Sequence, residues 1–578
     1  MTKKQSLLVF SIGPVQSFIA AARKLEDLWS GSYVLSYLAE SGIKRLFHLG
    51  DEQGLSVEMV YPAETRETLQ DKWHEDHVDI ASIPNRFVAI VGGNQIKTAE
   101  MARNIAETVK SEMKRLCVEA IALVFPEGVN RERMNQVADE QVEKALELFW
   151  ATEELSDLQQ FESARAQLEK RLAAAKNNRQ YSAFCQTGLI CTVCSQRDAL
   201  CDEEFAEDET IGQMTAKLRT TWEKRNKSLK QYTRGEPGEG RIKAGEYLCA
   251  ICLGKRVSRE FFRKEKNVDG NTFNRFESTI DLAGKKSYYA VMAMDGDNMG
   301  AWFSGEKKLP GVEQSDSQLD SYREVSRRLG FFAKRVVPSA VKKYDGQLIY
   351  AGGDDILAMV PLSGVFALAQ ELRQAFSDPE KGLGEQATAS MGIVIAHQKS
   401  PLYNTLDWAR AMEGVAKQYV HTESKKEKDA FSLAYLARSG EIRYVTLPWV
   451  FVTEGGKRSM VSCVQELVQE LGRNMSSTFI YSFGRAFMPL LGTNDYSRKL
   501  NIFEKDQEKN EGLLRMELER LLARAEKQSD QKIDVSRMAD CLTSIHRAVA
   551  STLQFIHFME IARNVGGILY GSRVNAAG

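Results

Sequence analysis

The stretch Tyr350-Ala351-Gly352-Gly353-Asp354-Asp355-Ile356 places two glycines and two carboxylates between the apolar runs 347–351 and 356–360. Glycine supplies the positive φ that a tight turn requires, so the pattern predicts a β-hairpin with adjacent acids at its tip. Adjacent carboxylates repel each other, and a fold that holds them together usually does so around a divalent cation with oxygen ligands. An ordinary turn is the alternative, because glycine and aspartate are common turn residues.

A second acidic cluster, Asp295-Gly296-Asp297-Asn298, directly follows the apolar run 288–294. Helical spacing at 319–336 and 366–376, an apolar run at 390–396 and a helix from about Pro401 complete the order strand, helix, hairpin, helix, strand, helix. This order predicts an antiparallel sheet with helices on one face and the first strand beside the hairpin. The two acidic clusters then approach each other, as in a two-metal site for phosphoryl or nucleotidyl transfer.

Four cysteines with paired spacing form the other strong signal. Cys191 and Cys194 make one knuckle, and Cys249 and Cys252 make a second. Four thiolates so spaced predict one structural zinc site away from the chemistry. The nearby Cys185 and Cys201 leave an alternative open, because either could replace a knuckle member. The charged stretch between the knuckles, which contains residues 222–227, is predicted to be an insertion.

The other three cysteines, Cys117, Cys463 and Cys541, are isolated in sequence and are predicted to be packed side chains without a role. From about Glu441 the pattern changes to helices at 461–471, 513–522 and 538–561, with a loop at 492–509, which predicts a helical bundle.

Length and composition indicate a cytoplasmic protein of several domains. A chain of 578 residues suggests roughly three to five domains, and no apolar stretch reaches the roughly eighteen residues of a membrane span. The chain shows no signal peptide, and its net charge is −1. RNA contacts are therefore expected only at local basic patches, such as Arg23-Lys24.

The acidic hairpin, the second cluster and the helix ending Val415-Ala416-Lys417 resemble the palm domain shared by nucleotide cyclases and polymerases. The Gly-Gly-Asp-Asp form is similar to the large subunit of type III CRISPR effector complexes, whereas diguanylate cyclases have Phe where this chain has Ile356. At the N-terminus, Ile12-Gly13-Pro14-Val15-Gln16-Ser17-Phe18-Ile19 and Pro84-Asn85-Arg86-Phe87 resemble the first palm of the Cmr-type (type III-B) large subunit.

The resemblance implies an α+β fold with two ferredoxin-like palms, a helical zinc-binding insert and a C-terminal helical bundle. The expected boundaries are 1–130 for a non-catalytic first palm, 131–283 for the insert, 284–440 for the second palm and 441–578 for the bundle. Expected partners are the small helical subunit, the subunit that binds the guide 5′ end and other Cmr-type subunits, together with guide RNA and target RNA, and no membrane.

The resemblance further implies a target-RNA-activated enzyme that converts ATP to cyclic oligoadenylate by attack of a 3′-hydroxyl on an α-phosphate. Asp295, Asp297, Asp354 and Asp355 are expected to hold Mg²⁺ or Mn²⁺, and all of these except Asp297 are the expected catalytic residues. The expected nucleotide-binding residues are Gly352, Gly353, Asn298, Ser390 and Lys417. Two alternatives stay open: transfer of AMP from ATP to S-adenosylmethionine, and a catalytically idle scaffold.

Many type III large subunits also carry a His-Asp nuclease domain, and this chain contains no His-Asp dipeptide. The nearest imitation, His74-Glu75-Asp76-His77, is predicted to be a loop without metal. The sequence therefore predicts that this polypeptide does not degrade single-stranded DNA.

Overall fold

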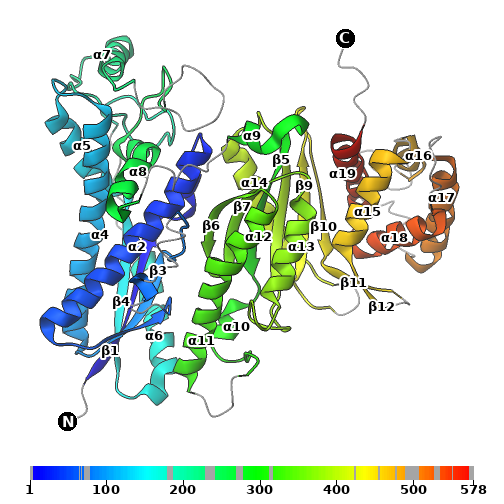
Figure 1. The fold of residues 1–578 in the computed structure, drawn as a ribbon, viewed down its shortest axis with the longest axis horizontal. Coiled ribbons are helices and arrows are strands. Elements are labelled where there is room, and N and C mark those ends of the chain that lie inside the picture. The colour runs from blue at the N-terminus through cyan, green and yellow to red at the C-terminus, as the bar shows by residue number, and fades with distance from the viewer. Residues whose placement is uncertain are drawn as a thin grey trace.

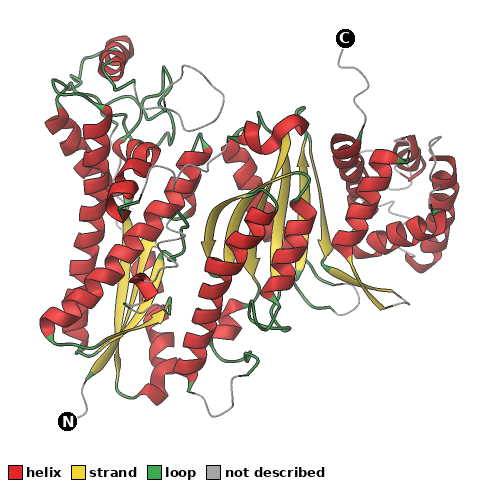
Figure 2. Ribbon diagram, viewed as in Figure 1, coloured by secondary structure: helices red, strands yellow, loops and turns green. Residues whose placement is uncertain are grey.

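The computed structural model describes residues 4–63, 66, 68–70, 79–178, 186–227, 241–268, 278–311, 317–421, 425–453, 456–475, 478–487, 507–525, 534–549 and 551–571. Two α/β units and a group of C-terminal helices lie side by side along the long axis of the molecule (Figures 1 and 2). We call residues 5–177 the first unit and residues 288–448 the second unit. The 74–77 segment and Cys185 lie outside the described residues.

The first unit is built on a four-stranded antiparallel sheet with strand order β2-β3-β1-β4. Side chains alternate along β1, so that Leu8 and Phe10 face helices α2 and α4 while Leu7 and Val9 face helix α6. The elements are β1 (Gln5–Gly13), α1 (Gln16–Ala20), α2 (Leu25–Gln53), β2 (Val57–Tyr61), β3 (Arg86–Val91), α4 (Gln95–Val124), α5 (Arg131–Ala145), β4 (Glu147–Leu155) and α6 (Phe161–Asn177).

Strand β4 extends this sheet past residue 130, into the region that was predicted to be helical. It pairs with β1 along its whole length, from Gln5 opposite Leu155 to Gly13 opposite Glu147. The all-helical prediction for the region from residue 131 is therefore wrong at β4, which belongs to the first sheet.

The second unit contains a six-stranded sheet with strand order β10-β9-β8-β5-β7-β6. The predicted order of strands and helices is confirmed, but β9 pairs parallel to β8, so the sheet is mixed. Its elements are β5 (Tyr288–Gly296), α10 (Met299–Phe303), α11 (Gln318–Phe331), a π-helical turn (Phe332–Val336), α12 (Val337–Lys343), β6 (Gln347–Gly352), β7 (Asp355–Pro361), α13 (Val365–Phe376), β8 (Ala389–His397), α14 (Leu402–Ala416), β9 (Ala430–Leu436) and β10 (Ile442–Pro448).

Helices cover both faces of the second sheet, and the prediction of helices on one face is wrong. Helices α11, α12 and α13 pack on the face that carries Met292 and Ile356, whereas α14 packs on the face that carries Val291 and Leu357. The first unit packs beside α14, where Ser32 of α2 donates a buried hydrogen bond to the carbonyl oxygen of Ile349.

The segment that carries the cysteine knuckles is more ordered than predicted. It contains α7 (Ile211–Glu223), α8 (Ala250–Lys266) and the short α9 (Thr279–Ala283). Trp222, which was assigned to a charged insertion, is 1% exposed and packs edge-on against Phe125 with ring centroids 5.2 Å apart. A buried tryptophan anchors α7 to the first unit through one large apolar contact.

The C-terminal region begins with strands, although helices were predicted from about residue 441. Strand β10 completes the second sheet, and β11 (Val450–Thr453) and β12 (Gly456–Ser459) form a hairpin. The helices are α15 (Met460–Arg473), α16 (Thr478–Phe487), α17 (Gln507–Ala525), α18 (Val535–Ala548) and α19 (Thr552–Tyr570). The single helical pattern predicted at 538–561 is two helices, and the start of α17 overlaps the loop predicted at 492–509.

Cys463 of α15 and Cys541 of α18 are buried, as predicted, and their thiols are neighbours across the two helices. Cys117 is buried between the helices of the first unit, as predicted. None of the described helices combines the length and apolar character needed to cross a membrane.

Candidate active site at the acidic hairpin

The tip of the β6–β7 hairpin requires both of its glycines. Gly352 pairs with Asp355, and Gly353 has a φ of 91°, which side chains other than glycine rarely adopt. A Cβ placed on Gly352 would lie 1.7 Å from the hydroxyl oxygen of Tyr350, because the tyrosine ring folds over that position. The two glycines therefore leave the backbone bare where the two aspartates begin.

The two acidic clusters converge at one end of the sheet, as the sequence predicts. Met294 of β5 lies opposite Ile356 of β7, so the following Asp295 and the preceding Asp355 leave the paired strands at the same end. A Cβ placed on Gly296 would lie 2.9 Å from the Cβ of Asp354, so Asp354 packs directly on the second cluster. Four carboxylates are thus gathered on two neighbouring strands and their loops.

Asp297 is held by the protein itself. Its side chain is fully buried, and its two oxygens accept hydrogen bonds from the hydroxyl of Ser390 at 2.8 Å and the backbone amide of Asp429 at 3.0 Å. Burial raises the pKa of this carboxyl. Ser390 lies opposite Asp295 across the β5–β8 pair, so it supports both acids of the cluster.

Asn298 adopts the left-handed conformation, with a φ of 56°, and its side-chain oxygen accepts a hydrogen bond from Nζ of Lys428 at 2.5 Å. The neighbouring Asp429 is bound by Arg373 of α13, with Nε 2.7 Å from the carboxylate. The loop between α14 and β9 thereby joins the acidic end of the sheet.

Lys417, which directly follows α14, forms an ion pair with Asp295. Its Nζ also lies 3.4 Å from the carboxylate of Glu413, one helical turn earlier. The helix lies this close because β8 carries Gly392, where a Cβ would be 2.1 Å from the carbonyl oxygen of Ala409 and 2.5 Å from the amide nitrogen of Glu413. A bare backbone at Gly392 therefore brings the charged end of α14 onto the acidic cluster.

Glu413 is a fifth acid of the site that the sequence analysis did not single out. Its side chain is 14% exposed, and burial, followed by the charge of Asp355, raises its pKa to about 7. The pKa of Asp354 is also raised to about 7. Burial is the main cause and the charge of Asp355 adds to it, whereas a hydrogen bond from the backbone of Asp354 opposes the shift. Arg410 partly offsets the burial that raises the pKa of Asp355. Arg410, Glu413 and Lys417 recur at steps of three and four, a spacing that could have revealed one charged helix face.

The donor set fits hard divalent cations. Asp295, Asp354, Asp355 and Glu413 offer carboxylate oxygens, which Mg²⁺ and Mn²⁺ prefer. Burial is the main cause of the raised pKa values of Asp354, Asp355 and Glu413. The carboxylates do not form a close-set group like the thiols described next.

The four predicted knuckle cysteines come together. Ligand atoms of Cys191, Cys194, Cys249 and Cys252 all lie within 4.8 Å of one another, and no other set of three or more metal-ligating side chains among the described residues is so close. The two sulfurs of Cys194 and Cys249 are 3.8 Å apart. Four converging thiols fit zinc in tetrahedral coordination. Cys201 stands outside this cluster, 3.4 Å from the hydroxyl of Thr221, so it does not replace a knuckle member.

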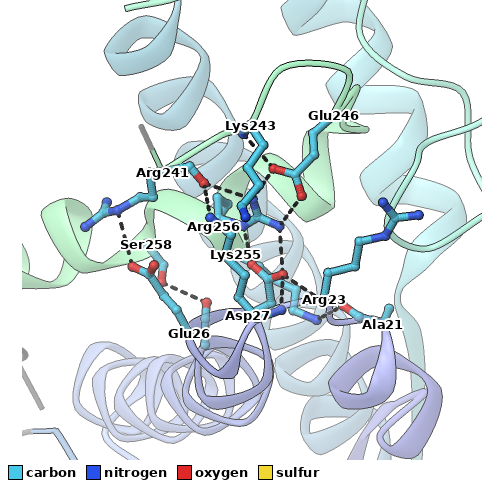
Figure 3. Close-up of polar contacts among 12 residues, drawn as sticks. Ala21, Arg23, Glu26, Asp27, Arg241, Lys243, Glu246, Lys255, Arg256 and Ser258 are labelled. Carbon is cyan, nitrogen blue, oxygen red and sulfur yellow. Dashed lines mark hydrogen bonds and ion pairs between the residues drawn. The ribbon is translucent and has the colours of Figure 1, made fainter. Parts of the chain in front are cut away.

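A buried ion network connects the cysteine cluster to the first unit (Figure 3). Arg256 of α8, the helix that starts beside Cys249, donates to Asp27 of α2 at 2.9 Å and to Glu246 at 2.9 Å. Lys24 belongs to the same network. Its Nζ donates a hydrogen bond to the carbonyl oxygen of Arg241 at 2.8 Å, and burial lowers the pKa of its ammonium group. The predicted RNA patch at Arg23-Lys24 thus has one of its two cations turned inward.

The fold and the acidic hairpin together define a protein of the palm class. The family described as "Cas10/Cmr2, second palm domain" matches residues 288–431, and the family described as "CRISPR-associated protein Cmr2, N-terminal" matches residues 7–118. Two Cas10/Cmr2 family models thus match separate parts of this chain, which is similar to the large subunits of type III CRISPR complexes.

Curated relatives and solved structures agree with this assignment. The Cmr subunit Cmr2 of Pyrococcus furiosus is 24% identical over 78% of this chain and 63% of its own length. The chain therefore spans less than two thirds of that relative. The single-strand-specific deoxyribonuclease Cas10/Csm1 of subtype III-A from Streptococcus thermophilus is 28% identical over 35% of this chain and 23% of its own length.

Two cryo-EM structures of type III-B Cmr-beta, in the apo state and bound to cognate target RNA, contain chains with the same fold. Their TM-scores are 0.62 and 0.61, their sequence identities are 14% and 13%, and each match covers 97% of this chain and 82% or 83% of the other.

Proposed function

We propose that the second unit is a nucleotidyltransferase that joins ATP molecules through their 3′-hydroxyl and α-phosphate groups. The observation that supports this best is the convergence of Asp295, Asp354 and Asp355 from neighbouring strands, with Lys417 beside them. Carboxylates beside a turn without side chains suit a triphosphate that binds together with divalent cations. The two glycines let the phosphates approach the backbone closely. We further propose cyclic oligoadenylate as the product.

The residues divide the work as follows in this proposal. Asp295, Asp354 and Asp355 would hold Mg²⁺ or Mn²⁺, which supplies Lewis-acid stabilisation of the phosphoryl group and lowers the pKa of the attacking hydroxyl. Asp297 and Ser390 keep the β5 end in place through their hydrogen bond. Lys417 offers phosphate oxygens a cation, and Gly352 and Gly353 leave room for them. Asn298 orders the loop that carries Lys428.

The remaining parts of the chain are assigned supporting roles in the same proposal. The first unit is a ferredoxin-like palm whose sequence has no second Gly-Gly-Asp-Asp stretch, and the cysteine cluster holds one structural Zn²⁺. The C-terminal helices dock the small helical subunit, and the chain works within a Cmr-type complex that binds guide RNA and is activated by target RNA. Support comes from the family assignment and from the type III-B fold match.

The test is an assay of the assembled complex with target RNA, labelled ATP and Mg²⁺ or Mn²⁺, with and without S-adenosylmethionine. Cyclic oligoadenylate formed from ATP alone supports the proposal. A product that requires S-adenosylmethionine would identify a conjugating enzyme instead. No ATP consumption under either condition would leave the scaffold function. Complex reconstituted with the Asp354→Ala, Asp355→Ala double variant serves as the control for contaminating activity.

A further inference from the structure

The first unit touches the catalytic hairpin at its tip. Tyr61 is the last residue of β2 in the first unit, and its hydroxyl oxygen lies 3.7 Å from the position that a Cβ on Gly353 would occupy. Leu329 of α11 lies 3.8 Å from the same position. The Gly-Gly turn therefore lies between a side chain of its own unit and a side chain of the other.

Tyr61 also reaches the second acidic cluster through an aromatic chain. Its ring meets Phe303 edge-on, with centroids 5.8 Å apart, and Phe303 ends α10, the helix that starts immediately after Asn298. Phe303 packs on Tyr322 of α11 at 4.6 Å, and Tyr322 packs on Phe161 of α6 at 5.7 Å. Aromatic pairs of this kind stabilise a packed contact beyond the area that they bury.

Polar contacts fix the backbone on both sides of Tyr61. The amide of Ala63 donates to the hydroxyl of Ser326 at 2.8 Å, and Glu58 forms an ion pair with Arg323 at 2.7 Å. Both partners belong to α11, so the end of β2 and this helix move together. The ring of Tyr61 consequently has a defined place relative to the hairpin.

The electrostatics agree with this placement. Burial, and after it the charge of Asp354, raises the pKa of the Tyr61 phenol well above its usual range. The phenol therefore stays protonated and lies in the field of the carboxylate that follows the Gly-Gly turn. The pKa of Tyr350 is raised as well, first by burial and then by electrostatic interaction with Asp355 and Tyr61, so Tyr350 lies near the same groups.

We propose that Tyr61 is a positioning residue through which the first unit sets the location of the Gly352–Gly353 turn and, with it, Asp354. The hydroxyl is the part of the side chain that reaches the turn, and the ring is the part that packs on Phe303. A displacement of the first unit then moves both acidic clusters together. The effect on ATP turnover rests on the proposed function, whereas the effect on metal affinity does not.

The experiment compares Tyr61→Ala with Tyr61→Phe in the full chain. Mn²⁺ affinity is measured by calorimetry on nucleotide-free protein, and ATP kinetics are measured in the assembled complex. Tyr61→Ala should weaken Mn²⁺ binding and lower kcat by about 10- to 100-fold with little change in KM, because small misplacements of reacting groups have effects of this size. Tyr61→Phe keeps the ring against Phe303 but loses the hydroxyl at the turn, so it should show a smaller loss in both measurements.

Two control variants separate positioning from general damage. Tyr403→Ala removes an exposed tyrosine at the start of α14 and should change nothing. Glu58→Ala breaks the ion pair to Arg323 without touching the ring and should have a small effect. If Tyr61→Ala lowers the melting temperature strongly, the Tyr61→Leu variant is measured in its place. Leucine keeps an apolar contact but lacks the aromatic ring.

Unchanged Mn²⁺ affinity in folded Tyr61→Ala and Tyr61→Leu would overturn the proposal. Equal losses in Tyr61→Phe and Tyr61→Ala would also overturn it, since the ring packed on Phe303 would then have no part in placing the turn. If the parent complex consumes no ATP, the proposed function fails, and the Mn²⁺ measurements still decide the role of Tyr61.

Discussion

The two α/β units have the same strand order around their first strand but differ in the residues at its end. The first sheet runs β2-β3-β1-β4, and the second contains the corresponding run β6-β7-β5-β8. In the first unit, Ser11 of β1 lies opposite Arg86 of β3. In the second unit, Asp295 and Asp355 leave the corresponding strand pair together.

The helices that follow the corresponding strands β4 and β8 also differ in the charge that they present to the strand ends. Lys417 follows α14 and pairs with Asp295, whereas Arg86 of the first unit pairs with Glu169 on α6. A cavity of about 580 Å³, lined in part by Ser11, Glu147 and Lys176, lies at the same end of the first sheet. The same topology therefore presents a positive strand end in one unit and a negative one in the other. A shared fold does not determine chemistry, and the side chains at strand ends do.

The largest expected effect comes from removing the acids that distinguish the second unit. Asp354→Ala combined with Asp355→Ala should lower ATP-dependent product formation by several orders of magnitude, because metal-bound catalytic carboxylates carry several kcal/mol of transition-state stabilisation. Product is quantified by chromatography of labelled nucleotides, and RNA binding by filter retention should persist.

The matched change in the first unit is Ser11→Ala, which should leave Mn²⁺ affinity unchanged. Full ATP consumption by the double aspartate variant would refute the catalytic assignment. Loss of RNA binding together with activity would identify the hairpin as a folding element.

The next effect concerns the metal that supports the first unit. Cys252→Ser should remove zinc, which elemental analysis should find at about one ion per parent chain, and should lower the melting temperature because metal binding is coupled to folding. Hydrogen exchange should rise first around Asp27 and Arg256, whose ion pair connects α8 to α2. Cys201→Ser changes a buried cysteine outside the cluster and should keep its zinc. Equal zinc content in both variants would rule out the assignment.

A smaller effect is expected at Lys417, whose ammonium competes with a cation for Asp295. Lys417→Met should raise the Mn²⁺ affinity of nucleotide-free protein by about 0.5–1 kcal/mol, which is a change of about two- to fivefold for a half-exposed pair. ATP turnover should fall in the same variant. Lys343→Met removes a similar ion pair, 2.7 Å from Glu371 on the surface, and should leave Mn²⁺ affinity unaltered. Weaker Mn²⁺ binding by Lys417→Met would contradict the competition.

The smallest effect is a pH dependence without metal. The pKa of Asp354 is raised from 3.8 to about 7, so the folded protein binds a proton that the unfolded chain releases between these values. Metal-free stability should therefore decline as pH rises through this window, and Mn²⁺ affinity should increase. In EDTA, the melting temperature of Asp354→Asn should be higher than that of the parent protein at pH 8 and close to it at pH 5. An equal difference at both pH values would show that Asp354 titrates normally.

The sequence predicts the second unit well because local patterns decide it. Strands β5, β6, β7 and β8 and helix α14 appear within two residues of the apolar runs and helical spacing that indicate them. Strands β6 and β7 and the start of α14 are bounded by glycine, proline or aspartate, which fix the ends of elements locally. The convergence of the two acidic clusters follows from this order alone.

The errors arise where neighbouring elements decide the outcome. Strand β4 is rich in glutamate, including Glu153 and Glu154, and only its pairing with β1 makes it a strand. Strand β10 follows the predicted domain boundary and is recruited by β9. The spacing of Glu413 could have indicated a charged helix face, but its approach to the acidic cluster depends on the close packing at Gly392. Tyr61 enters the site from the other unit, which no local pattern records. Such contacts exist only in the tertiary structure.

The two edges of the second sheet contact different parts of the chain. Helix α19 packs on the edge strand β10, and Arg443 joins it to Glu560 through an ion pair at 2.5 Å. At the opposite edge, β6 accepts the hydrogen bond from Ser32 of the first unit. The acidic hairpin is formed by β6 and β7, so it lies at the edge that meets the first unit and away from the C-terminal helices.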